Sequence, residues 1–201
     1  MARNMTYARE EALDALWCGA LPRQGKWSDE DYLWLTDETN RLVEFTDGFV
    51  EALPMPTSTH QAVLSFLNDC FKEHVVRLGG LVLFSALRVR VRQGKFREPD
   101  LLVLLDRDDP RFQDRFWLGA DLVVEVVSPK GRRRDLVQKP LDYAEAGIPE
   151  YWIVDPREET ITVLTLDGDA YTEHGVFRRG GTATSPLLQG LEVDVGAVFD
   201  A

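Results

Sequence analysis

The chain has 201 residues, a hydrophobic fraction of 44%, a charged fraction of 28% and a formal net charge of −11. These values suit one globular domain, and no apolar run reaches the roughly 18 to 20 residues that a membrane-spanning helix needs. The negative charge argues against a protein that coats nucleic acid. The acidic start of the chain, and two cysteines without metal-ligand spacing (Cys18 and Cys70), predict a cytoplasmic protein with free thiols.

The first predicted elements are a helical extension over residues 1–27 and the start of a main domain over residues 28–201. Apolar residues four apart favour a short amphipathic helix in the extension. Ser28 is predicted to cap the next helix, because three acidic residues follow it at the positive end of the helix dipole. Tyr32 and Leu33 would form the apolar side of that helix.

A hairpin and a long helix are predicted next. Two short apolar runs, residues 41–46 and 49–53, are joined by Asp47-Gly48, which is a strong hairpin signal. Thr57 or Ser58 is then predicted to cap a helix that runs to about Val76, with its buried side at helical spacing.

The rest of the chain predicts mainly strands. Residues 81–92 predict one long strand whose second half alternates apolar residues with arginine. Residues 100–105 and 121–127 are near-continuous apolar runs, as expected for central strands that are buried on both faces. A helix is predicted over residues 135–146, followed by strands at 150–154 and 160–166 and by short β segments. The order predicts an α/β or α+β domain with a mixed central sheet.

Glu125 is the most unusual residue of the sequence, because it lies inside a run of five valine and leucine residues. An ionised carboxylate in a doubly buried strand costs several kcal/mol unless a metal ion, an arginine or a lysine compensates it. Asp100 opens the other buried run directly after Pro99. Two carboxylates at the ends of neighbouring strands can share a hard cation such as Mg²⁺. The alternative is that Asp100 caps a turn and Glu125 pairs with a core arginine.

Lys139 is a third candidate. Asp135, Lys139 and Tyr143 lie four residues apart and therefore share one face of the predicted helix. A lysine near a metal can orient a water nucleophile and offset charge on a phosphate. The alternative is a surface ion pair between Asp135 and Lys139, which would contribute only a few tenths of a kcal/mol.

Two further residues are candidates for the same site. Glu44, on the first strand of the hairpin, could be a metal ligand or act through water, although alternation also permits an exposed position. His60, in the first turn of the long helix, could face the site and contact substrate, although a lone histidine there is more often structural. The other histidines, His74 and His174, form no ligand pair with it, which argues against a zinc site.

Positive charge gathers in two segments, residues 88–97 and residues 130–134. A basic rim around an acidic metal site could bind a phosphate backbone, and Arg88, Arg90 and Arg132 are the candidate contacts. Solvated turns are the alternative. Phosphate-binding glycine loops and the nucleophile motifs of serine hydrolases are missing from the sequence.

An ordered series of motifs resembles the Uma-two family of endonucleases from about residue 28 to the C-terminus. The motifs are Glu44-Phe45-Thr46-Asp47-Gly48, Pro54-x-Pro56, Ser58-Thr59-His60-Gln61, Pro99-Asp100-Leu101-Leu102-Val103, Asp121 to Pro129, Arg134-Asp135-Leu136, Lys139, Tyr143-Ala144-x-Ala146-Gly147-Ile148-Pro149-Glu150-Tyr151-Trp152 and Val154-Asp155-Pro156.

The resemblance implies a restriction-endonuclease-like fold of the PD-(D/E)XK superfamily that acts on nucleic acid, with DNA as the expected substrate and a homodimer as a possible assembly. It implies that Asp100 and Glu125 bind Mg²⁺ or Mn²⁺ and that Glu44 is the early acidic residue. The usual lysine position is Val127 here, so Lys139 on the following helix would take that role.

Two departures from the family pattern concern the site. Phe49 replaces an acidic residue often found after the Asp-Gly turn, and Pro140 follows Lys139 directly. Because proline is tolerated only in the first turn of a helix, the regular helix is predicted to begin near Leu136 or Val137.

Two other functions stay open at this point. One is a nuclease-like fold without turnover that serves as a binding or assembly module, which the net charge and Phe49 favour. The other is a metal-dependent hydrolase of a small phosphorylated molecule.

Overall fold

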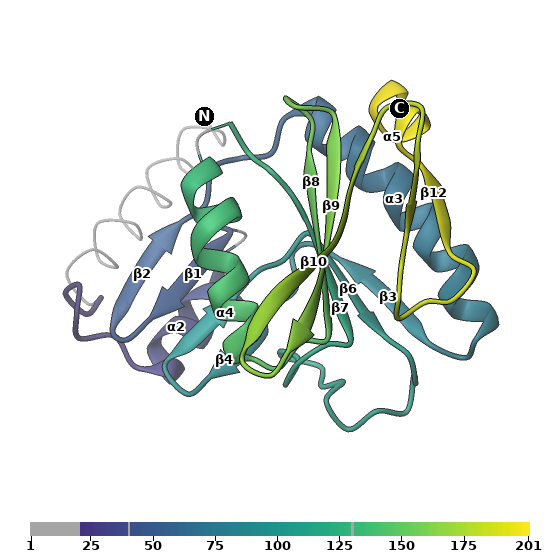
Figure 1. The fold of residues 1–201 in the computed structure, drawn as a ribbon. Coiled ribbons are helices and arrows are strands. Elements are labelled where there is room, and N and C mark those ends of the chain that lie inside the picture. Colours follow the sequence, from purple (N-terminus) through teal and green to yellow (C-terminus); the bar gives the residue numbers. More distant parts are fainter. Residues whose placement is uncertain (1–20, 40, 130) are drawn as a thin grey trace, which may run out of the picture.

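The computed structural model describes residues 21–39, 41–129 and 131–201 (Figure 1). The helix predicted in the extension before residue 21 lies outside these ranges. The helical elements are α2 (Asp29–Glu38), α3 (Ser58–Arg77), the π-helical turn η1 (Arg134–Gln138), α4 (Lys139–Glu145) and α5 (Val195–Asp200). The strands are β1 (Val43–Thr46), β2 (Phe49–Ala52), β3 (Leu81–Phe84), β4 (Val89–Arg92), β5 (Lys95–Arg97), β6 (Leu101–Leu104), β7 (Leu122–Val126), β8 (Glu150–Asp155), β9 (Thr160–Asp167), β10 (Ala170–Arg178), β11 (Thr182–Thr184) and β12 (Glu192–Asp194).

The strands form two principal sheets and one short pair. The larger sheet has the order β10-β9-β8-β7-β6-β3, and a four-stranded sheet has the order β2-β1-β5-β4. In the larger sheet β7 and β8 run parallel, joined by η1 and α4, whereas the other neighbours are antiparallel. The predicted mixed central sheet with flanking helices is therefore confirmed.

Helices cover both faces of the six-stranded sheet (Figure 1). On one face α3 contributes Leu67 and Phe71, and the Phe71 ring meets Trp152 edge-on with ring centroids 5.1 Å apart. On the other face α4 contributes Tyr143, which packs against Tyr151 at 5.1 Å. Because β6 and β7 have helices on both sides, their residues are buried throughout, as the continuous apolar runs predict.

The local signals around α2 and the hairpin are confirmed. Ser28 forms a capping box with Asp31 at the start of α2. Tyr32 on this helix packs between Phe45 and Phe96 of the four-stranded sheet, with ring centroids 5.3 and 5.0 Å away. Asp47-Gly48 joins β1 to β2, and both residues have positive φ, 47° and 88°.

The prediction of one strand over residues 81–92 is wrong. β3 is an edge strand that pairs with β6 in the larger sheet, while β4 pairs with β5 in the smaller one. The chain crosses from one sheet to the other between Phe84 and Val89. Alternation in the second half is confirmed, since Val89 and Val91 are buried and the arginines between them are not. Alternation shows which side of a strand is buried, but it does not identify the partner strand.

The C-terminal part contains more regular structure than the predicted short β segments. β10 is nine residues long, and the chain ends with α5, which Asp194 caps. Among the described residues no helix is both long and apolar enough to cross a membrane.

Candidate active site

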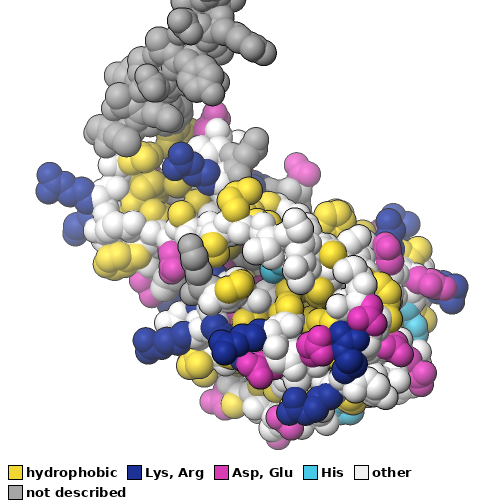
Figure 2. Space-filling view, turned by 90° about the horizontal axis from the view of Figure 1, so that it is seen from above, with side chains coloured by type: hydrophobic (Ala, Val, Ile, Leu, Met, Phe, Trp, Pro, Cys, Tyr) yellow, Lys and Arg dark blue, Asp and Glu magenta, His cyan; other side chains and the backbone are white. Residues whose placement is uncertain are grey.

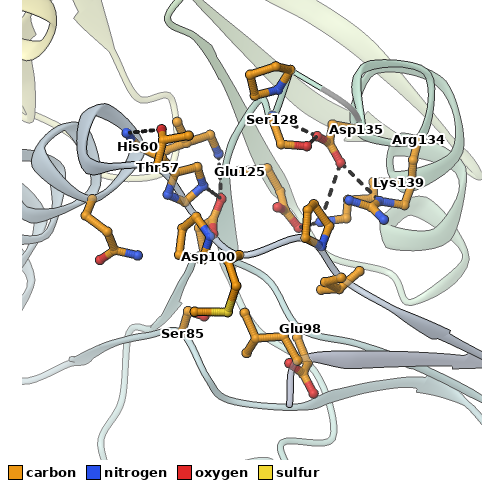
Figure 3. Close-up of a pocket in the computed structure, with 18 residues that line it drawn as sticks. Thr57, His60, Ser85, Glu98, Asp100, Glu125, Ser128, Arg134, Asp135 and Lys139 are labelled. Carbon is orange, nitrogen blue, oxygen red and sulfur yellow. Dashed lines mark hydrogen bonds and ion pairs between the residues drawn. The ribbon is translucent and has the colours of Figure 1, made fainter. Parts of the chain in front are cut away.

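A cavity of about 470 Å³ lies where the end of β7, the start of β6, η1 and the start of α3 meet. Antiparallel pairing of Leu101 with Val124 places Asp100, just before β6, across from Glu125. Both carboxylates line the cavity, as predicted for a shared site. Figure 3 shows the labelled side chains that converge here, which include Asp100, Glu125, Lys139, His60, Asp135 and Ser128.

Glu125 is compensated by a lysine and a tyrosine within the described structure. Its side chain is only 2% exposed, Lys139 Nζ lies 2.6 Å from its Oε1, and the Tyr143 hydroxyl donates a hydrogen bond to the same oxygen. Burial raises the pKa of Glu125 to about 8, with Asp100 and Asp135 adding to the rise and Lys139 opposing it. One oxygen is thus held by two donors, and Oε2 has no hydrogen bond to the described residues.

Lys139 is buried at the centre of the acidic residues, at 3% exposure. Its Nζ lies 3.6 Å from Glu44 Oε1 and 3.9 Å from Asp135 Oδ1, in addition to the contact with Glu125. Burial by itself lowers the pKa of Lys139, but these carboxylates outweigh burial and raise its pKa above the ordinary value. The group therefore stays charged. The pair of Asp135 and Lys139 is buried and is not the surface ion pair considered from the sequence.

The backbone before α4 explains how Lys139 turns inward despite Pro140. Residues of η1 form a π-helical turn, in which the Lys139 N–H donates to the carbonyl oxygen of Arg134. Regular α-helix then begins at Lys139, three residues after the predicted start near Leu136, with Pro140 in its first turn. Pro140 has no N–H to donate to the preceding turn. The wider π-helical turn accommodates this missing hydrogen bond, so the helix continues into α4.

Asp100 is held by two donors on one oxygen. His60 Nε2 lies 3.1 Å from Oδ2, and the backbone N–H of Val126 donates to the same atom at 2.8 Å. Burial lowers the pKa of His60, but the hydrogen bond to Asp100 and the negative charge of that carboxylate together outweigh burial and raise the pKa above its ordinary value. The second oxygen of Asp100 has no hydrogen bond to the described residues. His60 thus faces the site, which is one of the two possibilities that the sequence left open for it.

Asp135 is fixed by the end of the β7 segment. Its Oδ2 accepts hydrogen bonds from the Ser128 N–H at 3.0 Å and from the Ser128 hydroxyl at 3.1 Å. Gly131 allows this close approach, because a Cβ there would meet Ser128 Oγ at 2.4 Å and Asp135 Oδ2 at 3.0 Å.

Two more buried glutamates surround the lysine. Glu44 on β1 is 3% exposed and Glu98 is 6% exposed, so Glu44 does not occupy the exposed strand position that alternation also permitted. Burial raises the pKa of Glu98 to about 7, and the nearby Glu44 carboxylate adds to the rise. One oxygen of each, Glu44 Oε1 and Glu98 Oε2, has no hydrogen-bond partner among the residues that the structure describes.

Acidic side chains outnumber basic ones among the residues that line the cavity. Among the described residues that line it are four carboxylates, Glu98, Asp100, Glu125 and Asp135, and two permanently charged cations, Arg134 and Lys139. In residues 21–39, 41–129 and 131–201, no three His, Cys, Asp or Glu side chains are arranged as a metal site.

The predicted phosphate-binding arginines contact side chains that do not line the cavity. Arg88 binds Asp37 at 2.8 Å, Arg132 binds Asp155 at 2.6 Å, and Arg90 lies over the ring of Phe116. None of these three arginines lines the cavity. Arg134, from the second basic segment, does line it and contacts Asp135 at 3.3 Å.

Sequence reasoning missed Glu98 and included Ser128 only as part of a family motif, whereas Arg134 belongs to the second basic segment, which was predicted to contact phosphate. Glu98 and Ser128 flank motifs that were already singled out, Pro99-Asp100 and the Glu125 run, so proximity in the chain was the available signal. Tyr143 was placed on the correct helix face, but its hydrogen bond to Glu125 depends on the π-helical turn.

The fold and the site place this protein among nuclease-like α/β domains. A crystal structure of a putative nuclease belonging to DUF820 from Anabaena variabilis ATCC 29413 superposes with a TM-score of 0.73, at 21% identity, over 87% of this chain and 98% of that chain. Residues 29–196 match the family Uma2, described as putative restriction endonuclease, and the chain belongs to that family. Comparison with curated proteins gives no match.

Proposed function

We propose that this protein is a divalent-metal-dependent endonuclease that hydrolyses phosphodiester bonds of nucleic acid, with DNA as the expected substrate. Membership of the Uma2 family supports the reaction class. The observation that carries the proposal is the placement of Asp100 and Glu125 on paired strands, facing one cavity in which carboxylates outnumber cations. Such a surplus of buried negative charge is stabilised by a cation.

The donor set suits Mg²⁺ or Mn²⁺, which Asp100 and Glu125 would hold. Mg²⁺ commonly uses one or two protein carboxylates and takes its other ligands from water and substrate phosphate, so a third protein ligand is not required. Each carboxylate has one oxygen fixed by protein donors and one oxygen without a hydrogen bond to the described residues. When bound, the ion would polarise a phosphate oxygen and lower the pKa of a water molecule.

Lys139 is the proposed catalytic cation. Its charge is maintained by Glu125, Glu44 and Asp135. From this position its ammonium group would donate a hydrogen bond that orients the attacking water and would offset negative charge as it builds on the phosphate. Glu44, at 3.6 Å, balances this charge and is proposed as the fourth member of the site.

Other side chains act through these groups. His60 would fix the orientation of Asp100, and Tyr143 that of Glu125, so both are positioning residues. Arg134 is the proposed phosphate contact inside the cavity. Arg88, Arg90 and Arg132 stay proposed contacts for parts of a strand that extend beyond it.

Nicking of supercoiled plasmid DNA by purified protein in millimolar Mn²⁺ tests the proposal. Asp100→Ala should lower the rate by at least about 100-fold, as loss of a central electrostatic group does in other enzymes. Asp169→Ala is the matched control, because Asp169 is an exposed aspartate outside the cavity. Equal nicking by the wild type and Asp100→Ala would reject the assignment.

A binding or assembly module without turnover is the second candidate. The specific observation in its favour is that the described residues offer no three-ligand metal group. Calorimetric titration distinguishes the two functions. The absence of heat from Mg²⁺ or Mn²⁺ binding at millimolar concentration would support the module and contradict the endonuclease.

A further inference from the structure

The cavity has an apolar wall that the proposed chemistry does not use. Besides the acids, it is lined by apolar side chains from the chain segments on either side of the β1–β2 hairpin, namely Leu42, Leu53, Pro54, Met55 and Pro56. Met55 is 85% exposed. A methionine so exposed contributes little to the core, and its apolar side chain is free to contact a ligand in the cavity together with the four apolar residues beside it.

The wall is rigid and poor in hydrogen-bond donors. Pro54 and Pro56 fix their own φ angles, restrict Leu53 and Met55 to extended conformations and remove two backbone N–H groups. The thioether of Met55 is polarisable and adapts to many shapes. Such a surface can pack against the flat face of an aromatic ring, but it has few groups that could form hydrogen bonds with the polar edge of that ring.

The depth of the acids limits what can reach them. Glu125 is 2% exposed and Lys139 3% exposed, and a cavity of about 470 Å³ has the size of a small-ligand site. A stacked duplex is a stiff rod, which holds each phosphodiester beside its neighbours. An unpaired strand can turn its backbone inward and place one base against a side wall, as single-strand and base-flipping proteins require.

The surface charge also disfavours a docked duplex. In the first predicted basic segment, Arg88 and Arg92 lie 2.8 and 2.7 Å from aspartates, and Lys95 lies 2.9 Å from Asp142. Figure 2 shows Lys and Arg side chains interspersed with Asp and Glu on the face that it displays, without a continuous basic tract. Duplex affinity depends mainly on such tracts.

We propose that the substrate is an unpaired stretch of nucleic acid and that the wall around Met55 binds the base next to the scissile phosphate. This inference rests on the proposed function. It deepens that function by naming the substrate class, and it predicts little preference among the four bases, because the wall offers contact area and few polar groups.

The test uses one oligonucleotide sequence in four forms: single-stranded DNA, single-stranded RNA, full duplex DNA and duplex DNA with a central unpaired bubble. Cleavage in Mn²⁺ should be at least about tenfold faster for the unpaired and bubble forms than for the duplex, since each stacked base contributes substantially to binding. The RNA arm shows which sugar the site accepts. Equal rates on duplex and unpaired DNA would overturn the inference.

A binding measurement separates failure of this inference from failure of the proposed function. Fluorescence anisotropy with labelled oligonucleotides, without added metal, should show the same preference, and Met55→Ser should weaken single-strand binding about fivefold or more. Leu78→Ser is the matched control, because Leu78 is an exposed apolar residue at the other end of α3. If the protein does not cleave but its binding still depends on Met55, only the proposed nuclease activity is rejected. If Met55→Ser binds as tightly as the wild type, the proposal that this wall binds a base is overturned.

Discussion

Two neighbouring cavities share Arg134 but differ in their balance of charge. In the candidate active site, four lining carboxylates face Arg134 and Lys139. The neighbouring cavity, of about 320 Å³, is lined by three acids, Glu44, Glu51 and Asp142, and by three cations, Lys95, Arg97 and Arg134. Both lie beside α4, so the difference is not one of location.

The buried carboxylate of Asp142 in the balanced cavity is paired on both of its oxygens. Lys95 forms an ion pair with one Asp142 oxygen at 2.9 Å, and Arg97 forms an ion pair with the other at 2.7 Å. In the active site, by contrast, burial raises the pKa of Glu98 to about 7 and that of Glu125 to about 8. The ion pairs of the balanced cavity join β5 of the four-stranded sheet to α4. The active-site cavity instead holds carboxylates whose charge a proton or a cation must neutralise.

The largest expected effect comes from breaking the balanced cavity. Asp142→Asn would leave Lys95 and Arg97 buried without a full counter-charge and should lower the free energy of unfolding by about 3 kcal/mol. Urea unfolding measures this loss. Mn²⁺ affinity of the folded variant should stay unchanged, because Asp142 does not line the active-site cavity. A loss of Mn²⁺ binding without a loss of stability would reverse the roles of the two cavities.

Adding a divalent ion should produce the next largest effect, and only through the active site. An ion that binds the folded state alone stabilises it by about 2.7 kcal/mol at 100 times its Kd. Thermal unfolding with and without Mn²⁺ should therefore show a rise in Tm for the wild type and for the control Asp169→Asn. Asp100→Asn and Glu125→Gln should show none. An equal rise in all four proteins would place the ion elsewhere.

The raised pKa of Glu98 should make the free energy of unfolding depend on pH. A carboxyl whose folded pKa is raised to about 7 keeps its proton in the folded state at pH values where the unfolded chain has lost it. Stability therefore falls as pH rises from the ordinary value of 4.5 towards 7. Glu98→Gln removes this loss, so the difference in stability between variant and wild type should grow between pH 4 and pH 8 in urea titrations. A constant difference would contradict the raised pKa.

The smallest expected effect concerns the orientation of Asp100. His60→Gln should weaken Mn²⁺ binding about tenfold, the lower end of what loss of a supporting residue costs a metal site. Calorimetric titration measures this change, and His174→Gln on the exposed strand β10 is the control. Affinity equal to that of the wild type would show that the contact between His60 and Asp100 is structural only.

Much of the site could be identified from local patterns in the sequence. Asp100 and Glu125 stood out as acids at the start of one apolar run and within another, helical spacing singled out Lys139, and Glu44 was a candidate on the predicted hairpin. The structure brings these four residues together around one cluster of charges. Their roles in metal binding and catalysis stay predictions.

Other features were decided only by the tertiary structure. The basic residues were visible in the sequence, but several of them pair with acids far away in the chain, as Arg97 does with Asp142. The same is true of the split between β3 and β4, which depends on two different partner strands.

The sequence by itself determined the caps, the Asp-Gly turn and the strands that must be buried, because these depend on neighbouring residues and on regular spacing. Tertiary structure decided which charges are paired, that η1 is a π-helical turn, and that Glu98, Asp135 and Arg134 join the site. Ion pairing and burial are set by groups that meet only after the two sheets and α4 have packed together, so no local pattern encodes them.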